Sequence, residues 1–207
     1  MSFTNPPIDP LFANAWHLKN VGGAAQGNGT VGADIRVSSA WQKYTGKGVL
    51  VGVLDDGVEL THPDLVANLW TRPGSVLLVD ASNANLTTGA AVTAGLDGPA
   101  DNHGTPVAGV IAAVGNNGIG GVGVAPGAQL VSYRVLGTNN AGADLCFQQA
   151  LNDGAQVLNN SWGADAAFNT PGTATLNAIA TLGTQGRGGL GTIIAFAEGN
   201  ERGSKLD

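Results

Sequence analysis

The feature that constrains this chain most is a short, almost wholly apolar run, GVLVGVL at 48–54, which stops at Asp55, Asp56 and Gly57. A run that is apolar on both sides is typical of a strand in the centre of a parallel sheet, where helices cover both faces. An edge strand or a half-exposed strand would instead alternate apolar and polar residues. The run therefore predicts a buried central strand that ends in a carboxylate pair.

Other segments extend this pattern into an α/β fold. Strands are expected at 128–135, 155–158 and 192–197, and helices at 105–114, 141–153 and 173–185. Leu145, Ala150 and Leu151 give the second of these helices one apolar face. Strands that alternate with helices predict a parallel central sheet with helices on both faces, in one domain spanning 1–207.

Composition and charge narrow the classes of function. Lys and Arg number 9 against 15 Asp and Glu, and this net charge of −6 argues against a nucleic-acid partner. No apolar run approaches the roughly 18 residues of a membrane span, and the N-terminus shows no signal peptide. Cys146 is the only cysteine, so no disulfide within the chain is expected.

Three polar residues follow strands or open a helix, where α/β folds place their sites. Asp55 ends the first strand, His103 opens a helix, and Asn200 follows the last strand. A carboxylate can hold an imidazole by its Nδ1–H, and a side-chain amide can stabilise an oxyanion. The helix N-terminus is expected to lower the imidazole pKa and favour the neutral base. Each residue alone is more often a turn or loop residue, but together they predict a hydrolytic site.

Four motifs, in order, resemble those of subtilisin-like serine endopeptidases, the subtilases. They are VLDDGVELTHPDL at 53–65, NHGT at 102–105, NNSWG at 159–163 and the segment from QGRGGLGT to AEGN at 185–200. The double aspartate and the glycine-rich segment resemble the kexin and furin branch in particular. The resemblance implies a subtilisin-like fold in which Asp55 orients His103, His103 is general base and then acid, and Asn200 lies in the oxyanion hole.

The resemblance also implies a nucleophilic serine that this chain does not contain. In the family that serine lies in a Gly-Thr-Ser helix start well after the oxyanion asparagine, and none of the chain's eight serines has this context. We therefore expect a catalytic domain truncated at its C-terminus, inactive unless a complementing C-terminal segment supplies the serine. The resemblance further implies a secreted or extracellular protein.

A calcium site is implied by the same resemblance, since oxygen-only cages combine carboxylates, amides and main-chain carbonyls. The glycine-rich loop at 116–123 matches the family's calcium loop. The implied ligands are the carboxylates of Asp9 and Asp64, the side chain of Asn117 and the carbonyls of Val114, Ile119 and Gly121. The alternative is a solvated glycine turn.

Substrate contacts are implied for a peptide or protein with basic side chains. Asp56 would face the basic residue one position before the scissile one, and Asp144 a basic residue further upstream. Asp165 is a candidate for the primary pocket, and the strand Ser161, Trp162, Gly163 would bind the substrate main chain. Surface solvation of these aspartates is the competing interpretation.

Two other functions stay open at this point. One is a catalytically inactive peptide-binding fragment that keeps the groove. The other is a nucleotide-binding α/β domain, since GIGGVG at 118–123 fits a G-x-G-x-x-G pattern. That fingerprint needs a strand before it and a helix after it, whereas here the expected order is reversed.

Overall fold

The computed structural model describes residues 6–72, 78–80, 102–136, 142–163 and 171–200. The chain forms two compact units. The first, here called the N-terminal unit, comprises 1–48, 60–69 and 108–129, and the second, the sheet unit, comprises 49–59, 70–107 and 130–207. In the described ranges, no helix is both long and apolar enough to cross a membrane.

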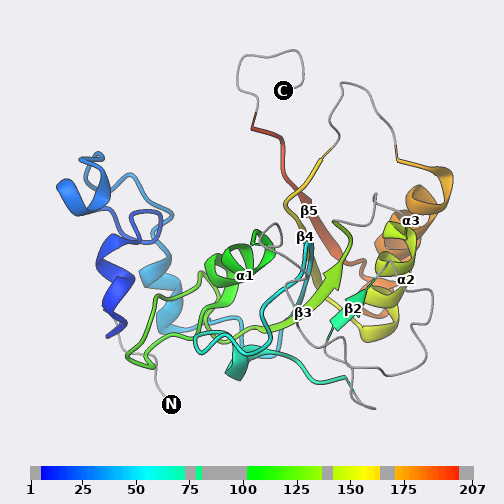
Figure 1. Ribbon diagram of the computed structural model, residues 1–207, viewed down its shortest axis with the longest axis horizontal. Helices are drawn as coiled ribbons and strands as arrows, with labels where there is room; N and C mark the ends of the chain where they lie inside the picture. The colour runs from blue at the N-terminus through cyan, green and yellow to red at the C-terminus, as the bar shows by residue number, and fades with distance from the viewer. Residues whose placement is uncertain (1–5, 73–77, 81–101, 137–141, 164–170, 201–207) are drawn as a thin grey trace. The chain divides into compact units, whose positions relative to one another are not determined.

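A five-stranded sheet carries the sheet unit (Figure 1), in the order β2-β3-β1-β4-β5. Its strands are β1 (Leu50–Asp55), β2 (Leu78–Asp80), β3 (Gln129–Arg134), β4 (Val157–Asn160) and β5 (Ile193–Phe196). The pairs β2–β3, β1–β4 and β4–β5 are parallel, and Leu54 lies opposite Asn160 in the β1–β4 register. All six residues of β1 are buried, which explains why its sequence is apolar on both sides.

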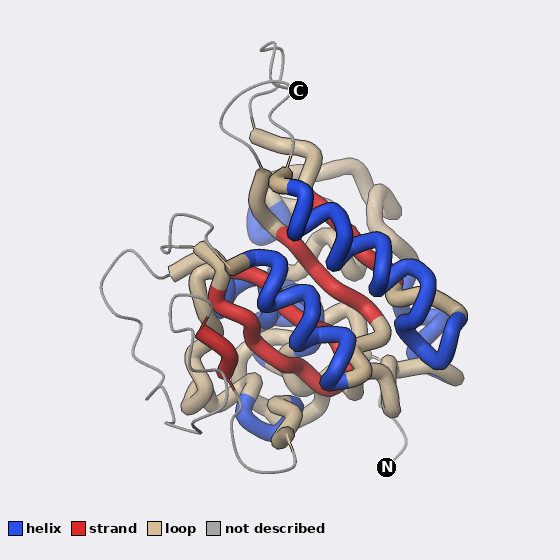
Figure 2. The backbone as a smooth tube through the Cα atoms, turned by 90° about the vertical axis from the view of Figure 1, so that its right-hand side faces the viewer, coloured by secondary structure: helices blue, strands red, loops and turns tan. Residues whose placement is uncertain are grey.

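Helices α2 (Ala143–Asp153) and α3 (Thr173–Gly189) lie side by side over the same face of the strands, as Figure 2 shows. The core between them and the sheet includes Tyr133, Phe147 and Leu182, each with 0% exposure. Helical geometry in α3 is interrupted at 186–188, close to the expected helix end at Gln185. Helix α1 (Gly104–Ala112) begins directly after His103.

The described residues of the N-terminal unit include four short 3₁₀ helices. Their bounds are Pro10–Asn14, Ala24–Gln26, Val37–Gln42 and Val66–Asn68. A small core of Leu18, Trp41 and Val122 packs against Phe12 of the first of these helices and Val37 of the third. The indole N–H of Trp41 donates to the carbonyl oxygen of Val124 at 2.9 Å. This unit therefore relies on a few aromatic and aliphatic anchors.

The predicted strands and helices are confirmed, with bounds that differ by at most four residues. Strand β2 was not predicted, because three residues carry too little pattern. The described structure divides into two compact units, and the single domain spanning 1–207 remains a prediction.

Candidate active site

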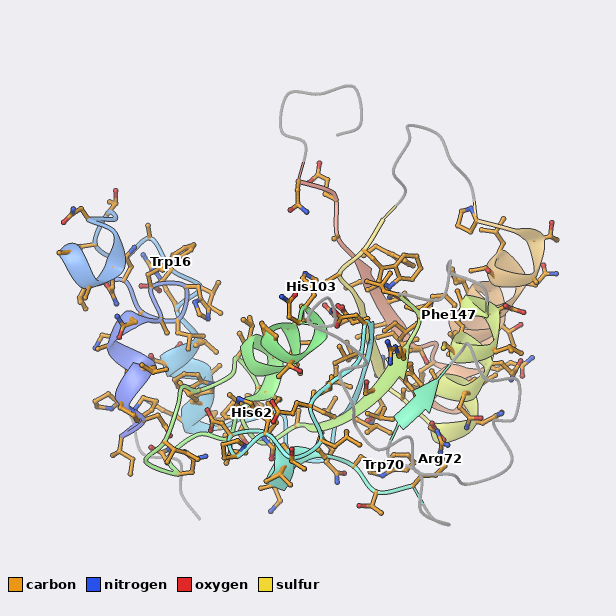
Figure 3. All side chains as sticks on the ribbon, viewed as in Figure 1. Trp16, His62, Trp70, Arg72, His103 and Phe147 are labelled. Carbon is orange, nitrogen blue, oxygen red and sulfur yellow. The ribbon has the colours of Figure 1, made fainter. Side chains whose placement is uncertain are left out.

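Asp55 and His103 form a close pair at the carboxyl end of β1. Figure 3 labels His103, which directly precedes α1. The Nδ1 atom of His103 lies 2.9 Å from Oδ1 of Asp55 and 3.1 Å from Oδ2. The Asp55 side chain is fully buried, whereas that of His103 is 53% exposed. One edge of the imidazole is thus held by a buried carboxylate, and the ring is otherwise open to solvent.

The end of β1 is fixed by main-chain hydrogen bonds to the residues that follow β3. The carbonyl oxygen of Asp55 accepts the amides of Val135 and Leu136, at 2.8 and 3.1 Å. The amide of Asp56 donates to Oδ1 of Asp55 at 2.8 Å. These bonds within the protein orient the Asp55 carboxylate in the absence of substrate.

The hydrogen bond between the imidazole and the accepting carboxylate of Asp55 is the largest influence on the pKa of His103, and it raises that pKa above its ordinary value. The predicted lowering of that pKa is wrong, because the adjacent carboxylate outweighs desolvation. Burial raises the pKa of Asp55, and its bond to His103 opposes this rise. The pair therefore holds a proton between the two side chains more firmly than an isolated histidine would.

Asn200 is the third predicted catalytic residue. It follows β5 with an exposed side chain, and no hydrogen bond joins it to the Asp55–His103 pair among the described residues. Within the same ranges, no serine hydroxyl bonds to the imidazole of His103. The structure thus assembles two of the predicted groups and leaves the oxyanion role of Asn200 as a prediction.

The predicted substrate strand begins where β4 ends, next to β1 in the sheet. The indole N–H of Trp162 donates to the carbonyl oxygen of Leu54 at 3.0 Å, and the side-chain amide of Asn159 donates to Oγ of Ser161 at 2.9 Å. Gly163 is exposed. The segment is therefore attached to the strand that ends in Asp55.

The acidic residues expected to contact substrate have different environments. Asp56 is 7% exposed and lies beside the pair. Asp144 occupies the first turn of α2, where a negative charge also stabilises the helix dipole. Asp165 lies outside the described residues.

The residues expected to bind calcium gather in the N-terminal unit. The two oxygens of Asp9 accept the amides of Asn116 and Asn117 at 2.7 and 3.1 Å. Asp64 accepts the side-chain amide of Asn117 at 2.7 Å and the main-chain amide of Gly121 at 2.9 Å. Both carboxylates are buried.

The remaining expected ligands are joined to the same cluster. The amide of Val114 donates to the carbonyl oxygen of Asp64 at 2.9 Å, and that of Ile119 to Oδ1 of Asn117 at 3.0 Å. A Cβ added at Gly120 would overlap Oδ2 of Asp64, so the loop wraps closely around this carboxylate. In the described part of the chain, no group of three or more His, Cys, Asp or Glu side chains is placed to hold a metal ion. The carboxylates of Asp9 and Asp64 are of the ligand type that calcium takes, and here they accept N–H donors of the loop.

The G-x-G-x-x-G pattern at 118–123 lies between α1 and β3. A helix precedes it and a strand follows, which is the reverse of a dinucleotide-binding unit. Its glycines instead serve the Asp64 loop. This order argues against the nucleotide-binding alternative.

One site residue had no predicted role. Gly104 follows His103, and a Cβ there would overlap the carbonyl oxygen of Gly57 and lie 3.0 Å from Cβ of Asp55. Only glycine allows α1 to start this close to the end of β1. A glycine directly after a helix-start histidine is the sequence signal for it.

A parallel α/β sheet with a carboxylate–imidazole pair at the end of its central strand is the framework of a hydrolase of the serine-peptidase type. Residues 46–207 match the profile of the Subtilase family. The chain belongs to the subtilase family.

Relatives of the kexin and furin branch match nearly the whole chain. A protein described as PC3-like endoprotease variant B from Hydra vulgaris is 38% identical over 202 residues, covering 94% of this chain and 26% of the relative. Furin from Bos taurus is 36% identical over 199 residues, covering 94% of this chain and 23% of furin. The resemblance stated from the four motifs is confirmed.

A solved structure supports the fold. The serine protease of Aeromonas sobria, in complex with the chaperone ORF2, superposes with a TM-score of 0.74 at 30% identity, over 94% of this chain and 32% of that chain. The predicted subtilisin-like architecture is confirmed. The chain spans about a quarter of the length of these two relatives and about a third of the Aeromonas sobria protease.

Proposed function

We propose that this chain forms the acid–base half of a serine endopeptidase site. The observation that carries the proposal is the 2.9 Å contact between Nδ1 of His103 and the buried carboxylate of Asp55. That contact fixes the imidazole so that Nε2 is the nitrogen available for proton transfer. Membership of the subtilase family supports the same reaction class.

In the proposed mechanism His103 accepts the proton of a serine hydroxyl as that oxygen attacks the peptide carbonyl. In this proposal a complementing C-terminal segment would supply the serine, since none of the chain's eight serines has the family's Gly-Thr-Ser context. Asp55 stabilises the imidazolium, which then returns the proton to the leaving amine. Asn200 donates its side-chain amide to the oxyanion, and losing such a donor typically costs about 10²–10³-fold in turnover. The chain alone would bind peptides without cutting them.

We propose that the substrates are peptides or proteins with basic side chains near the scissile bond. Asp56 and Asp144 supply carboxylates, and Ser161, Trp162 and Gly163 supply the main-chain edge. Similarity to an endoprotease and to furin supports an endopeptidase role. A secreted or extracellular location is proposed on the family resemblance alone.

We also propose that Ca²⁺ is bound by the Asp9–Asp64 cluster of the N-terminal unit. Asp9, Asp64 and Asn117 would supply side-chain oxygens, and Val114, Ile119 and Gly121 carbonyl oxygens. The ion would act as a structural cross-link between the segments that carry these residues.

Affinity alkylation tests the groove and the free imidazole nitrogen without needing the serine. A basic peptide with a bromoacetyl group is incubated with the chain; the nitrogen lone pair forms an N–C bond and bromide leaves. Saturable labelling of His103 is expected, with competition by a basic but not by an acidic peptide. His17 and His62 are internal controls for non-specific alkylation, read by peptide mass spectrometry.

Unselective labelling of all three histidines, or labelling indifferent to basic competitor, would contradict the proposed groove. A separate assay uses a fluorogenic peptide with paired basic residues and the chain alone. No hydrolysis is expected. Turnover abolished by a serine-reactive phosphonate would show that this chain contains its own nucleophile.

A further inference from the structure

We propose that Asp56 is a positioning residue for His103. Its carboxylate holds the main chain at the start of α1 and thereby fixes the imidazole against Asp55. This role differs from the substrate contact proposed above for the same side chain. It rests on His103 being the base of the proposed function, but it is tested below without any measurement of peptide hydrolysis.

The geometry that carries the inference is a two-point contact between one side chain and one helix start. Oδ2 of Asp56 accepts the amide of His103 at 2.8 Å, and Oδ1 accepts the amide of Gly104 at 2.6 Å. Asp56 is 7% exposed, so these bonds are shielded from competing water. Both oxygens of the carboxylate are therefore engaged by main-chain donors.

Donors at a helix start have no partner within the helix, so they need an acceptor from elsewhere. The side chain of the residue just before a helix usually accepts the amide of the second or third helical residue. Here the amides of His103 and Gly104 are accepted by Asp56, which lies 47 positions before His103. A negative charge at this end also complements the helix dipole, and α1 itself contains no charged side chain to do so.

Two consecutive residues at the end of β1 thus hold different parts of the same histidine. Asp55 holds the imidazole through Nδ1, while Asp56 holds the main-chain amide. The two acids are themselves linked, because the amide of Asp56 donates to Oδ1 of Asp55 at 2.8 Å. With main chain and ring both fixed, the imidazole loses the freedom to turn away from Asp55.

The substrate role and the positioning role are compatible in principle. A carboxylate has about four acceptor positions, and the two amides use one on each oxygen. An experiment can separate the two roles, because only the positioning role requires Asp56 to control how strongly Asp55 and His103 interact.

A mutant cycle measures that interaction directly. The chain has three histidines, so the imidazole of His103 can be followed by NMR during a pH titration and assigned by substitution. The quantity measured is how far Asp55→Asn lowers the pKa of His103. This effect is determined in three backgrounds, namely the unmodified chain, the Asp56→Asn variant and the Asp56→Ala variant.

We expect the effect of Asp55→Asn on the pKa of His103 to be graded. It should be largest in the unmodified chain, smaller in Asp56→Asn, which keeps one acceptor oxygen, and less than half of its original size in Asp56→Ala. The amides of His103 and Gly104 should exchange faster with solvent in the same order. Asp144→Asn is the matched control, since it removes another proposed substrate carboxylate and should leave the effect of Asp55→Asn intact.

An unchanged effect of Asp55→Asn in both Asp56 variants would overturn the proposal, even if they bound basic peptides less tightly. If Asp56→Ala does not fold, Asp56→Asn decides alone, because it preserves the size of the side chain. Failure of the proposed function would show instead as unselective alkylation of His103 in the unmodified chain. The two failures are therefore distinguishable.

Discussion

The indole N–H of Trp162 donates a hydrogen bond to the main-chain oxygen of Leu54, 108 residues earlier in the chain, at 3.0 Å. Leu54 immediately precedes Asp55, so this bond ties the proposed substrate strand to the strand that carries the catalytic carboxylate. The indole also meets Phe196 edge to face, with ring centroids 5.5 Å apart. Trp162 thus connects the proposed substrate strand to β1, in addition to its predicted contact with substrate.

Replacing Trp162 by Phe should keep most of the aromatic packing and remove the bond to Leu54. We expect a loss of about 1 kcal/mol in the free energy of unfolding, as is typical of one hydrogen bond with a buried partner. Urea denaturation measures it. Trp16→Phe is the control, because the Trp16 side chain is 56% exposed and donates no hydrogen bond among the described residues. Equal losses of stability in the two variants would show that the hydrogen bond between Trp162 and Leu54 does not stabilise the fold.

Gly104 and Gly109 lie in the same helix but have different surroundings. A Cβ at Gly104 would overlap the carbonyl oxygen of Gly57, whereas one at Gly109 would meet no atom within 4 Å. Gly104→Ala should therefore cost about 1–3 kcal/mol through overpacking. Gly109→Ala should stabilise the helix by roughly 0.5–1 kcal/mol. Thermal unfolding of both variants checks this, and a neutral Gly104→Ala would show that β1 and α1 are not closely apposed.

The fold was predictable where an element is buried on all sides and its residues must therefore be apolar. Strand β1 is buried at all six positions, and its sequence shows this directly. Helix α2 was harder, since Leu145 was expected in the apolar face but is 39% exposed. The buried face consists of Ala143, Cys146, Phe147 and Ala150. Spacing by three and four residues, rather than the presence of a leucine, marks the face.

The site was predictable only where one motif identifies one residue. Asp55 and His103 follow from their places at a strand end and a helix start. The bonds of Asp56 to His103 and Gly104 join residues 47 and 48 positions apart, and no local pattern contains that information. The predicted direction of the pKa shift of His103 was wrong for a related reason. The shift depends on whether the helix end or the neighbouring carboxylate of Asp55 has the larger effect on the imidazole, and the sequence does not give the distances that decide this.

The raised pKa of His103 predicts how stability depends on pH. The folded protein binds this proton more tightly than the unfolded chain, so the imidazolium contributes stability below the ordinary pKa of 6.5. That contribution is lost as pH rises through the raised pKa. The stability difference between the unmodified chain and His103→Gln should therefore be larger at pH 5.5 than at pH 9.

His17 supplies a control with the opposite sign. Burial lowers its pKa, so the folded state binds its proton less tightly than the unfolded chain. His17→Gln should relieve a penalty at low pH, and relative to the unmodified chain it should be more stable at pH 5.5 than at pH 9. Urea midpoints across this range measure both variants. Parallel pH trends for the two would contradict the Asp55–His103 pair as the source of the shift.

The calcium proposal makes a prediction about the N-terminal unit. Two buried carboxylates share one loop there, and a cation would neutralise both while cross-linking residues from 9 to 121. Calcium at 100 times its Kd adds about 2.7 kcal/mol, so the midpoint should rise by about 5–10 °C on adding calcium and fall again with chelator. Differential scanning calorimetry provides the measurement.

Asp64→Asn should abolish this response to calcium, because it removes a ligand charge from the centre of the cluster. Asp34→Asn is the matched control in the same unit, since Asp34 also accepts two main-chain amides, those of Asn20 and Arg36, but lies outside the loop. That control should lower the midpoint while leaving the calcium-dependent rise unchanged. A calcium response that survives Asp64→Asn unchanged would contradict the assignment of Asp64 as a ligand, even though Asp9 is a second buried carboxylate in the same cluster.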